Sequence, residues 1–357
     1  MQVLKEDEIY SNFYHSLRSA RTKQAYDYAL NQFMKFHNIT TYSSLLQTSN
    51  IEDKIKVYIL DIVNRELSSS TMKIFLAAVK NFFEMNDIEN IKWRKLKRFM
   101  GEKTPENEDR CYSHEEIQTL LNIADLRLKV TILLMASSGM RIGALPHLVL
   151  GHLERRGEIY KISVYKGQKG KGQYHTFCTP EAAKAIDTYL EFRKRCGEKI
   201  EPGSPLFRKE FDVDFHEGAR NRVESASIHS LRMDVFNSLV NSGLRIVDRI
   251  NSSRKRKEVK MTHGFRKFFE TMLVNTNLHE TIIRKLTGHS QTGNLTQLYS
   301  KQTEAEMLHE YEKAIDALTI DPANQLRKKV EKLEVEKTEI QSLRLELEKV
   351  KRAIAAK

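Results

Sequence analysis

The sequence contains few cysteines and no long apolar run, and each of these features makes some classes of protein unlikely. The three cysteines among the 357 residues, Cys111, Cys178 and Cys196, lie far apart and lack metal-ligand spacing. A disulfide framework and a zinc site are therefore not expected, and a reduced, cytoplasmic compartment is. No run of about 18 apolar residues occurs, so no transmembrane helix is expected. The N-terminal residues also lack the apolar stretch of a signal peptide.

Positive charge is what the sequence has in excess. Lysine plus arginine number 59 and aspartate plus glutamate 47, which gives a formal net charge of +12. This excess favours a polyanionic partner, and two basic clusters strengthen the expectation of nucleic-acid contact. For either cluster alone, a solvated surface loop is the alternative. The candidate DNA-binding residues in these clusters are Lys92, Arg94, Lys95, Lys97 and Arg98, then Arg254 and Lys255.

Hydrophobic periodicity divides the chain into a helical part and a longer mixed part. Apolar residues at spacings of three and four predict a small helical domain over residues 1–100. Residues 101–110 carry no large apolar side chain and predict an exposed linker. Ser113 and Glu116 then have the spacing of a capping box at a helix start. A second domain is therefore predicted over residues 111–320.

The apolar period changes from helical to alternating inside the second domain. Tyr160, Ile162 and Val164 alternate with polar residues, as in a half-buried strand, and residues 174–178 form the returning strand. The turn between them, residues 166–172, is rich in lysine and glycine. A β-hairpin with a lysine-rich tip is predicted. The expected fold class is therefore mainly α with a small β-sheet.

Helical patterns fill the remainder of the chain. Helices are predicted over residues 227–250 and 303–320, and the tail 321–357 repeats apolar residues every seven positions. The tail has two registers that differ by three residues. It is predicted to form a coiled-coil helix that pairs with another helix, and a helix folded back on its own domain is the alternative. The apolar positions are Leu326, Val330, Leu333 and Ile340, then Leu343, Leu347, Val350 and Ile354.

Cationic and titratable residues recur along the second domain. Arg141 follows a very apolar helix that is predicted to end at Gly139. A charge at the edge of a core needs a partner, and a nearby carboxylate would serve. Four more residues lie further along the chain, within one stretch of 37 residues, and each alone could be structural. They are His263, Arg266, His289 and Tyr299.

The order and spacing of these residues resemble the tyrosine recombinase (phage integrase) family. Ser138–Leu145 resembles its first arginine motif, His263–Arg266 its His-x-x-Arg motif and Leu286–His289 its Leu-Gly-His motif. Tyr299 stands where the family has its nucleophile. The resemblance covers most of the chain. Within the family, the sequence looks most like integrases of archaea and their mobile elements. It implies an N-terminal core-binding domain followed by an α+β catalytic domain.

Three positions depart from the family pattern. Ala144 stands where many members carry an acidic residue, and Lys267 stands where many carry histidine. The interval from His289 to Tyr299 is one residue longer than is common in the family.

The resemblance implies that the protein cuts and rejoins DNA without a metal or other cofactor. Arg141 and Arg266 would bind the non-bridging oxygens of the scissile phosphate. Tyr299 would attack the phosphorus and form a 3′-phosphotyrosyl bond. His263 would assist proton transfer at the tyrosine, and His289 would donate a hydrogen bond to the phosphate.

A lysine of the hairpin would protonate the leaving 5′-oxygen. Lys169 is favoured because it sits close to the returning strand, Lys166 is the alternative, and Lys171 stays open besides being a DNA-binding candidate. Tyr311 is the rival nucleophile, but its apolar neighbours at helical spacing favour a core position.

The expected function is that of a site-specific DNA recombinase or integrase. The resemblance implies double-stranded DNA as partner and a homo-tetramer on paired DNA sites. Two alternatives stay open, a type IB topoisomerase and a DNA-binding architectural factor that does not cleave. The tail disfavours the first because a single-chain relaxing enzyme needs no assembly helix, and Ala144 is the main support for the second.

Overall fold

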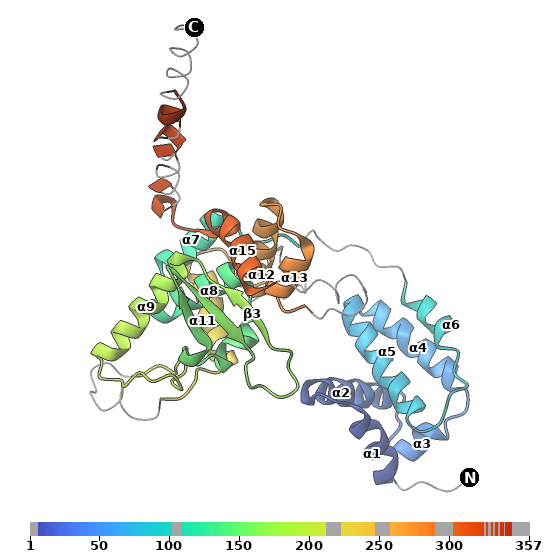
Figure 1. Cartoon of the computed structure of the whole chain (residues 1–357). Helices are drawn as coiled ribbons and strands as arrows, with labels where there is room; N and C mark the ends of the chain where they lie inside the picture. The colour runs from blue at the N-terminus through green and yellow to red at the C-terminus, as the bar shows by residue number, and fades with distance from the viewer. Residues whose placement is uncertain are drawn as a thin grey trace. The chain divides into compact units, whose positions relative to one another are not determined.

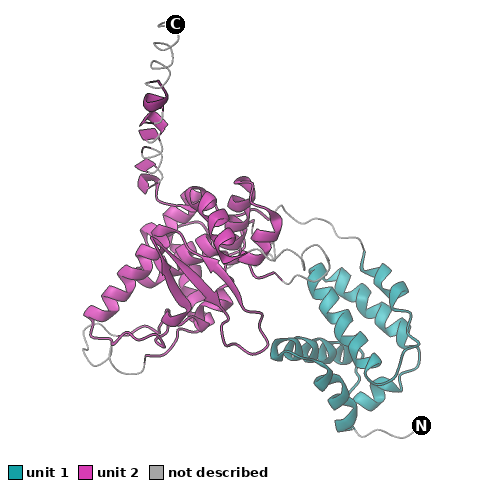
Figure 2. Cartoon of the chain, viewed as in Figure 1, with its two compact units in different colours: residues 1–106 teal, residues 107–357 magenta. Residues whose placement is uncertain are grey.

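The computed structural model describes residues 6–101, 109–211, 223–246, 258–289 and 303–344, the last range without residues 325, 328, 329, 331, 332, 335 and 339. The chain divides into two compact units, residues 1–106 and 107–357, coloured separately in Figure 2. Each unit has a hydrophobic core of its own. Most of the predicted linker lies outside the described residues.

The described part of the first unit is helical (Figure 1). Ser19, Thr41 and Ser68 each accept a backbone hydrogen bond at the start of the helix that follows, so the polar residues between apolar stretches act as N-caps. The helices are α1 (Glu6–Ser16), α2 (Ala20–Phe36), α3 (Tyr42–Leu46), α4 (Ile51–Asn64), α5 (Ser69–Glu84) and α6 (Trp93–Lys97), with a 3₁₀ turn at Arg98–Met100.

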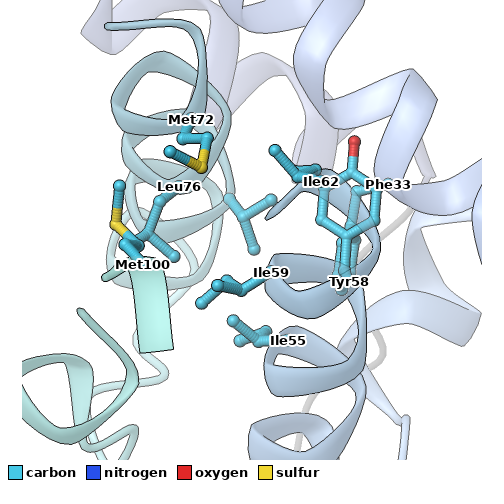
Figure 3. A pocket seen from close by; sticks show the side chains of 9 residues that line it. Phe33, Ile55, Tyr58, Ile59, Ile62, Met72, Leu76 and Met100 are labelled. Atoms are coloured by element: carbon cyan, nitrogen blue, oxygen red, sulfur yellow. The ribbon is translucent and has the colours of Figure 1, made fainter. Parts of the chain in front are cut away.

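A small apolar cavity lies inside the first unit (Figure 3). Its volume is about 10 Å³, which is at the lower limit of the space that one water molecule needs. The cavity is therefore a local packing gap and not a ligand site. Its lining comes from Phe33, Ile55, Tyr58, Ile59, Ile62, Met72, Leu76, Val79 and Met100.

The basic cluster at the end of the first unit is amphipathic. Trp93 and Leu96 of α6 are buried in the core. The cationic side chains around them face solvent, so the same short segment can pack inward and contact a polyanion outward. The exposed residues are Lys92, Arg94, Lys95, Lys97 and Arg98.

The second unit combines helices with a three-stranded antiparallel sheet of order β1-β2-β3 (Figure 1). The predicted hairpin is confirmed as β2 and β3, with Ile162 opposite Thr176. Strand β1 was not predicted, because its Leu-Glu-Arg-Arg sequence is exposed and shows no apolar alternation. The elements are α7 (His114–Asn122), α8 (Leu126–Ser138), the 3₁₀ helices η2 (Ile142–His147) and η3 (Leu150–His152), β1 (Leu153–Arg156), β2 (Ile159–Val164), β3 (Tyr174–Phe177), α9 (Pro180–Arg195), α11 (Ile228–Asn241), α12 (His263–Asn275), α13 (Glu280–Leu286) and α15 (Glu304–Leu318).

Helix α8 is the centre of the second core. Nearly all of its residues are buried, and it packs against α9 and α12. It ends as predicted at Gly139, whose positive φ of 64° suits a residue without a side chain. A Cβ at this position would lie 2.4 Å from the ring of Phe269 on α12. The close approach brings the end of α8, two residues before Arg141, against the helix that carries Arg266.

Two further predictions concern helix boundaries. The capping box of Ser113 and Glu116 is confirmed, with both reciprocal hydrogen bonds present. The helix predicted over residues 227–250 is too long, because α11 ends at Asn241 and Gly243 takes a φ of 74°. Its apolar pattern continues past the glycine, but the left-handed residue ends the helix.

A buried ion cluster supports the C-terminal end of α9. Glu198 accepts hydrogen bonds from Arg193 and from Arg208, the second at 2.6 Å. Burial raises the pKa of the Glu198 carboxyl, but the two guanidiniums outweigh burial and hold that pKa below its usual value. All three side chains are almost completely buried.

Helix α15 is fixed to the second core along its length. At its start Glu304 contacts Lys161 of β2 at 2.5 Å. In its middle Tyr311 is fully buried and donates a hydrogen bond of 2.8 Å to the carbonyl oxygen of Ser137. The expectation that Tyr311 packs in the core is confirmed. Just beyond its end, the Glu181 carboxylate accepts the backbone N–H groups of residues 320 and 321.

From residue 322 onward the tail is helical where it is described, and its described leucine, isoleucine and valine side chains face solvent. Within the described ranges, no helix is long and apolar enough to cross a membrane. The exposed apolar residues of the tail are Leu326, Val330, Leu333, Ile340 and Leu343.

Candidate active site

Arg266 is the buried centre of the site. It lies in the first turn of α12, and only 1% of its surface is exposed. Its Nη1 donates to the carbonyl oxygen of Gly139 at 2.9 Å, and its Nε lies 3.1 Å from Glu270. Its Nη2 lies 3.0 Å from Nε2 of His289. A buried guanidinium held on three sides has a fixed direction, as binding a planar anion requires.

His289 is held between Arg266 and Thr287. Because an arginine nitrogen can only donate, Nε2 of His289 accepts in this contact. The hydrogen of the neutral ring is then on Nδ1, which lies 3.0 Å from the hydroxyl of Thr287. Gly288 between them has a φ of 62°, and a Cβ there would lie 2.4 Å from the ring of Tyr174. The ring of Tyr174, at the start of β3, thus packs against the turn that positions His289.

Arg141 is exposed at the start of η2. Its guanidinium forms no hydrogen bond or ion pair with any residue in the described ranges, so the carboxylate partner that would make it structural is not found there. Burial first, and then the charge of Arg141, lower the pKa of Arg266. The two guanidiniums are therefore close enough to repel each other. Such a pair is stabilised by an anion that binds both.

Both candidate histidines are neutral near pH 7 for the same reason. Burial first, and then the charge of Arg266, lower the pKa of His289. Burial, followed by the charges of Lys260 and Arg266, lowers the pKa of His263. A neutral imidazole at the exposed start of α12 can accept a proton.

The three hairpin lysines differ in their surroundings. Lys166 and Lys169 are exposed. The charge of Lys166 contributes to lowering the pKa of His152 and of His175, after the larger effect of burial. Lys171 is also exposed as a residue, but its Nζ lies 3.0 Å from Nε2 of His147.

Tyr165 connects the hairpin to the arginines. The Nζ of Lys171 lies 4.6 Å from the centre of its ring, within the range of a cation–π contact. Burial raises the pKa of the Tyr165 phenol, and the charges of Arg141 and Arg266 oppose that rise. Of the three lysines, Lys171 is thus the one in contact with Tyr165, where the charges of both arginines oppose the rise in pKa that burial causes.

Some candidate residues lie outside the described residues. They are the proposed nucleophile Tyr299 and the basic residues Arg254 and Lys255. Lys267, at the position where many family members carry histidine, pairs with Asp109. It therefore faces the N-terminal end of this unit.

Sequence reasoning missed His147, Tyr165, Tyr174 and Glu270 as neighbours of the site. Their proximity depends on the packing of β2, β3, η2 and α12, and no local motif marks them. Among the described residues, no group of three or more His, Cys, Asp or Glu side chains is placed to hold a metal ion.

Residues 110–306 match the phage integrase family. Because this match covers more than half of the chain, the protein belongs to that family. A tyrosine recombinase XerC from Chlamydia caviae is 22% identical over 210 residues, which cover 54% of this chain and 66% of that protein. The chain therefore spans just under two thirds of the length of this relative.

Solved structures share the fold. The XerH site-specific recombinase bound to its difH substrate has a TM-score of 0.52 at 17% identity, over 87% of this chain and 85% of that chain. A lambda integrase dimer bound to a COC′ core site has a TM-score of 0.55 at 12% identity, over 79% and 72%. The predicted family and the mainly helical fold with a small sheet are confirmed. The likeness to archaeal integrases stays a prediction.

Proposed function

We propose that the protein is a site-specific DNA recombinase that cuts and rejoins duplex DNA through a covalent tyrosine link. The observation that carries the proposal is the convergence of Arg266, Arg141 and His289. Two neighbouring guanidiniums, of which Arg266 keeps its Nη2 toward His289 and Arg141 has no carboxylate partner among the described residues, form a site for a phosphodiester. The membership of the family and the solved relatives named with their DNA substrates support DNA as the partner.

The phosphate would rearrange the contacts at Arg266. In the structure its Nη2 donates to the His289 imidazole. A non-bridging oxygen would replace the imidazole as acceptor, and His289 in its other tautomer would donate to the same phosphate. Arg141 would bind from the exposed side. Charge that develops in the pentavalent transition state would then meet donors already in place.

The reaction is a transesterification without a redox step. The bond from Tyr299 Oη to phosphorus forms as the bond from phosphorus to the 5′-oxygen breaks. The phenol proton passes to the neutral imidazole of His263, and the 5′-oxygen takes a proton from a hairpin lysine, for which the sequence favours Lys169 over Lys166. The reverse step rejoins DNA without an external energy source, because the phosphotyrosyl link conserves the bond.

The covalent link is the direct test. A nicked duplex library with a randomised centre is incubated with the protein, and DNA that stays attached after denaturation is sequenced. The wild-type chain should capture a defined site, and Tyr299→Phe should bind the same site without a covalent adduct. If the wild-type chain gives no adduct, the protein is a DNA-binding factor that does not cleave. An adduct that survives Tyr299→Phe would reject this nucleophile.

The tail is proposed as the assembly element, with a second copy of the chain as its partner. Its exposed apolar side chains follow the seven-residue repeat and have no cover among the described residues. A chain that ends at Asp321 should sediment as a smaller species than the full chain at equal concentration. Equal sedimentation would remove the tail from assembly. Relaxation of supercoiled DNA by this shortened chain alone would favour the topoisomerase alternative.

A further inference from the structure

We propose that His147 and Tyr165 are positioning residues that hold Lys171 as the acid of the cleavage reaction. The inference rests on the proposed function, because an acid has a role only where a 5′-oxygen leaves. It begins with the backbone of the hairpin tip. The N–H of Gln168 donates to the carbonyl of Tyr165, and the N–H of Lys171 donates to the carbonyl of Gln168. Two consecutive turns therefore define where Lys171 lies.

The side chain of Lys171 is held at its charged end. Its Nζ donates to Nε2 of His147 at 3.0 Å and lies over the ring of Tyr165 at 4.6 Å. An ammonium group can only donate, so His147 accepts and must be neutral. Burial, followed by the charge of Lys171, lowers the pKa of His147 and keeps the ring in that state. A flexible lysine that is restrained at its nitrogen loses less freedom when it meets its target.

His147 connects the lysine to the phosphate-binding segment. It is the last residue of η2, which starts directly after Arg141. The six residues of η2 therefore join Arg141 to His147, which accepts the hydrogen bond from Lys171. Tyr165 has a φ of 58°, and its ring lies beneath the Lys171 nitrogen, with its centre 6.1 Å from the centre of the His147 ring. Lys166 and Lys169 are exposed and hold no comparable contact within the described residues.

The proton movement is balanced. As the bond from phosphorus to the 5′-oxygen breaks, the oxygen takes a proton from Lys171 Nζ and leaves as a hydroxyl group. The neutral amine keeps the electron pair and takes the proton back when that hydroxyl attacks the phosphotyrosine. His147 and Tyr165 exchange no proton in either direction and only hold the nitrogen in place.

A DNA substrate with sulfur in place of the bridging 5′-oxygen tests the assignment. A thiolate leaves without a proton near neutral pH, because a thiol has a pKa of about 8.5. With ordinary DNA, Lys171→Ala should slow adduct formation by about 10²–10⁴-fold, the usual contribution of an acid. With the sulfur substrate, the same variant should come within about tenfold of the wild-type rate. For Lys166→Ala and Lys169→Ala, the rate of adduct formation relative to the wild-type chain should be the same with the sulfur substrate as with ordinary DNA.

His147 and Tyr165 are tested in the same way. His147→Ala and Tyr165→Ala should slow cleavage of ordinary DNA by about tenfold or more and recover with sulfur, as expected for loss of a positioned acid. His147→Gln keeps an acceptor oxygen and should retain more activity than His147→Ala. Arg266→Ala should not recover, because its role is to bind the phosphate and not to protonate a leaving group.

The outcomes separate this inference from the proposed function. If the wild-type chain forms no adduct with either substrate, the proposed function fails first. If it forms an adduct and Lys171→Ala keeps the wild-type rate, or shows a defect that sulfur leaves unchanged, Lys171 is not the acid. Recovery of Lys169→Ala or Lys166→Ala instead would also overturn the assignment. A His147→Ala defect that sulfur does not relieve would mean that His147 serves only the fold.

Discussion

Replacing Gly288 by alanine is the sharpest test of how the turn before His289 is supported. Gly288 has a φ of 62°, and its added Cβ would lie 2.4 Å from the ring of Tyr174. The left-handed conformation costs an alanine about 1–2 kcal/mol. Displacement of a packed ring adds roughly 1–3 kcal/mol, as other overpacked sites do. The expected total is about 3 kcal/mol.

Gly157 provides the matched control. Its φ is 58°, but a Cβ there would meet nothing within 4 Å. Gly157→Ala should therefore cost only the conformational part, about 1 kcal/mol. The double variant Gly288→Ala with Tyr174→Ala removes the ring that the new methyl group meets. It should be more stable than the sum of the two single changes predicts, by about 1–3 kcal/mol.

Urea unfolding of each full-length variant measures these differences in free energy. Single-turnover cleavage at saturating DNA measures the consequence for His289, which Gly288→Ala should displace from Arg266, with a loss of about tenfold or more in rate. Equal stability of the Gly288 and Gly157 variants would refute the contact with Tyr174. Normal cleavage by an unstable Gly288→Ala would show that the turn serves folding and not the site.

Three further predictions follow from other contacts. Tyr311→Phe should lose about 1 kcal/mol, the net value of one buried hydrogen bond, and should still form the covalent adduct. Glu198→Gln should lose about 3–5 kcal/mol at pH 7, because it leaves two buried arginines without their carboxylate. The folded-state pKa of Glu198 lies below the usual 4.5, so its contribution is present above that value and is lost as the pH falls below it. Replacing Lys95 and Lys97 by glutamine should lower the slope of log affinity against log salt by about 0.9 for each lost phosphate contact.

Each of these predictions has a contrary outcome. A Tyr311→Phe chain without adduct would reinstate Tyr311 as a nucleophile candidate. Between pH 7 and 3, the free energy of unfolding should depend less on pH for Glu198→Gln than for the wild-type chain. An equal pH dependence of the two proteins would contradict the low pKa of Glu198. For the basic helix, Lys313→Gln in α15 is the control. An equal loss of salt dependence there would mean that overall charge, and not α6, is responsible.

The sequence predicted the parts of the site that short motifs define. Arg141 follows a buried helix with a glycine end, and the interval from His263 to Arg266 fits one turn of helix, so both could be placed from local pattern. The catalytic lysine could not be chosen from local pattern, because three candidates lie on one glycine-rich turn. The contact that distinguishes Lys171 from the other two is with His147, which is 24 residues upstream. Strand β1 was missed for a related reason, since an exposed edge strand needs no apolar alternation.

The attachment of α15 has a mechanical consequence. Tyr311 bonds to the carbonyl oxygen of Ser137, near the end of α8 that leads into Arg141. Glu181 of α9 holds the amides with which the tail begins. The tail therefore leaves the catalytic unit from a fixed origin and is not a loose tether. A force applied to the tail by a partner would reach α8 through these contacts. If tails pair as proposed, their pairing would act on the segment that carries Arg141, the residue proposed to bind the phosphate.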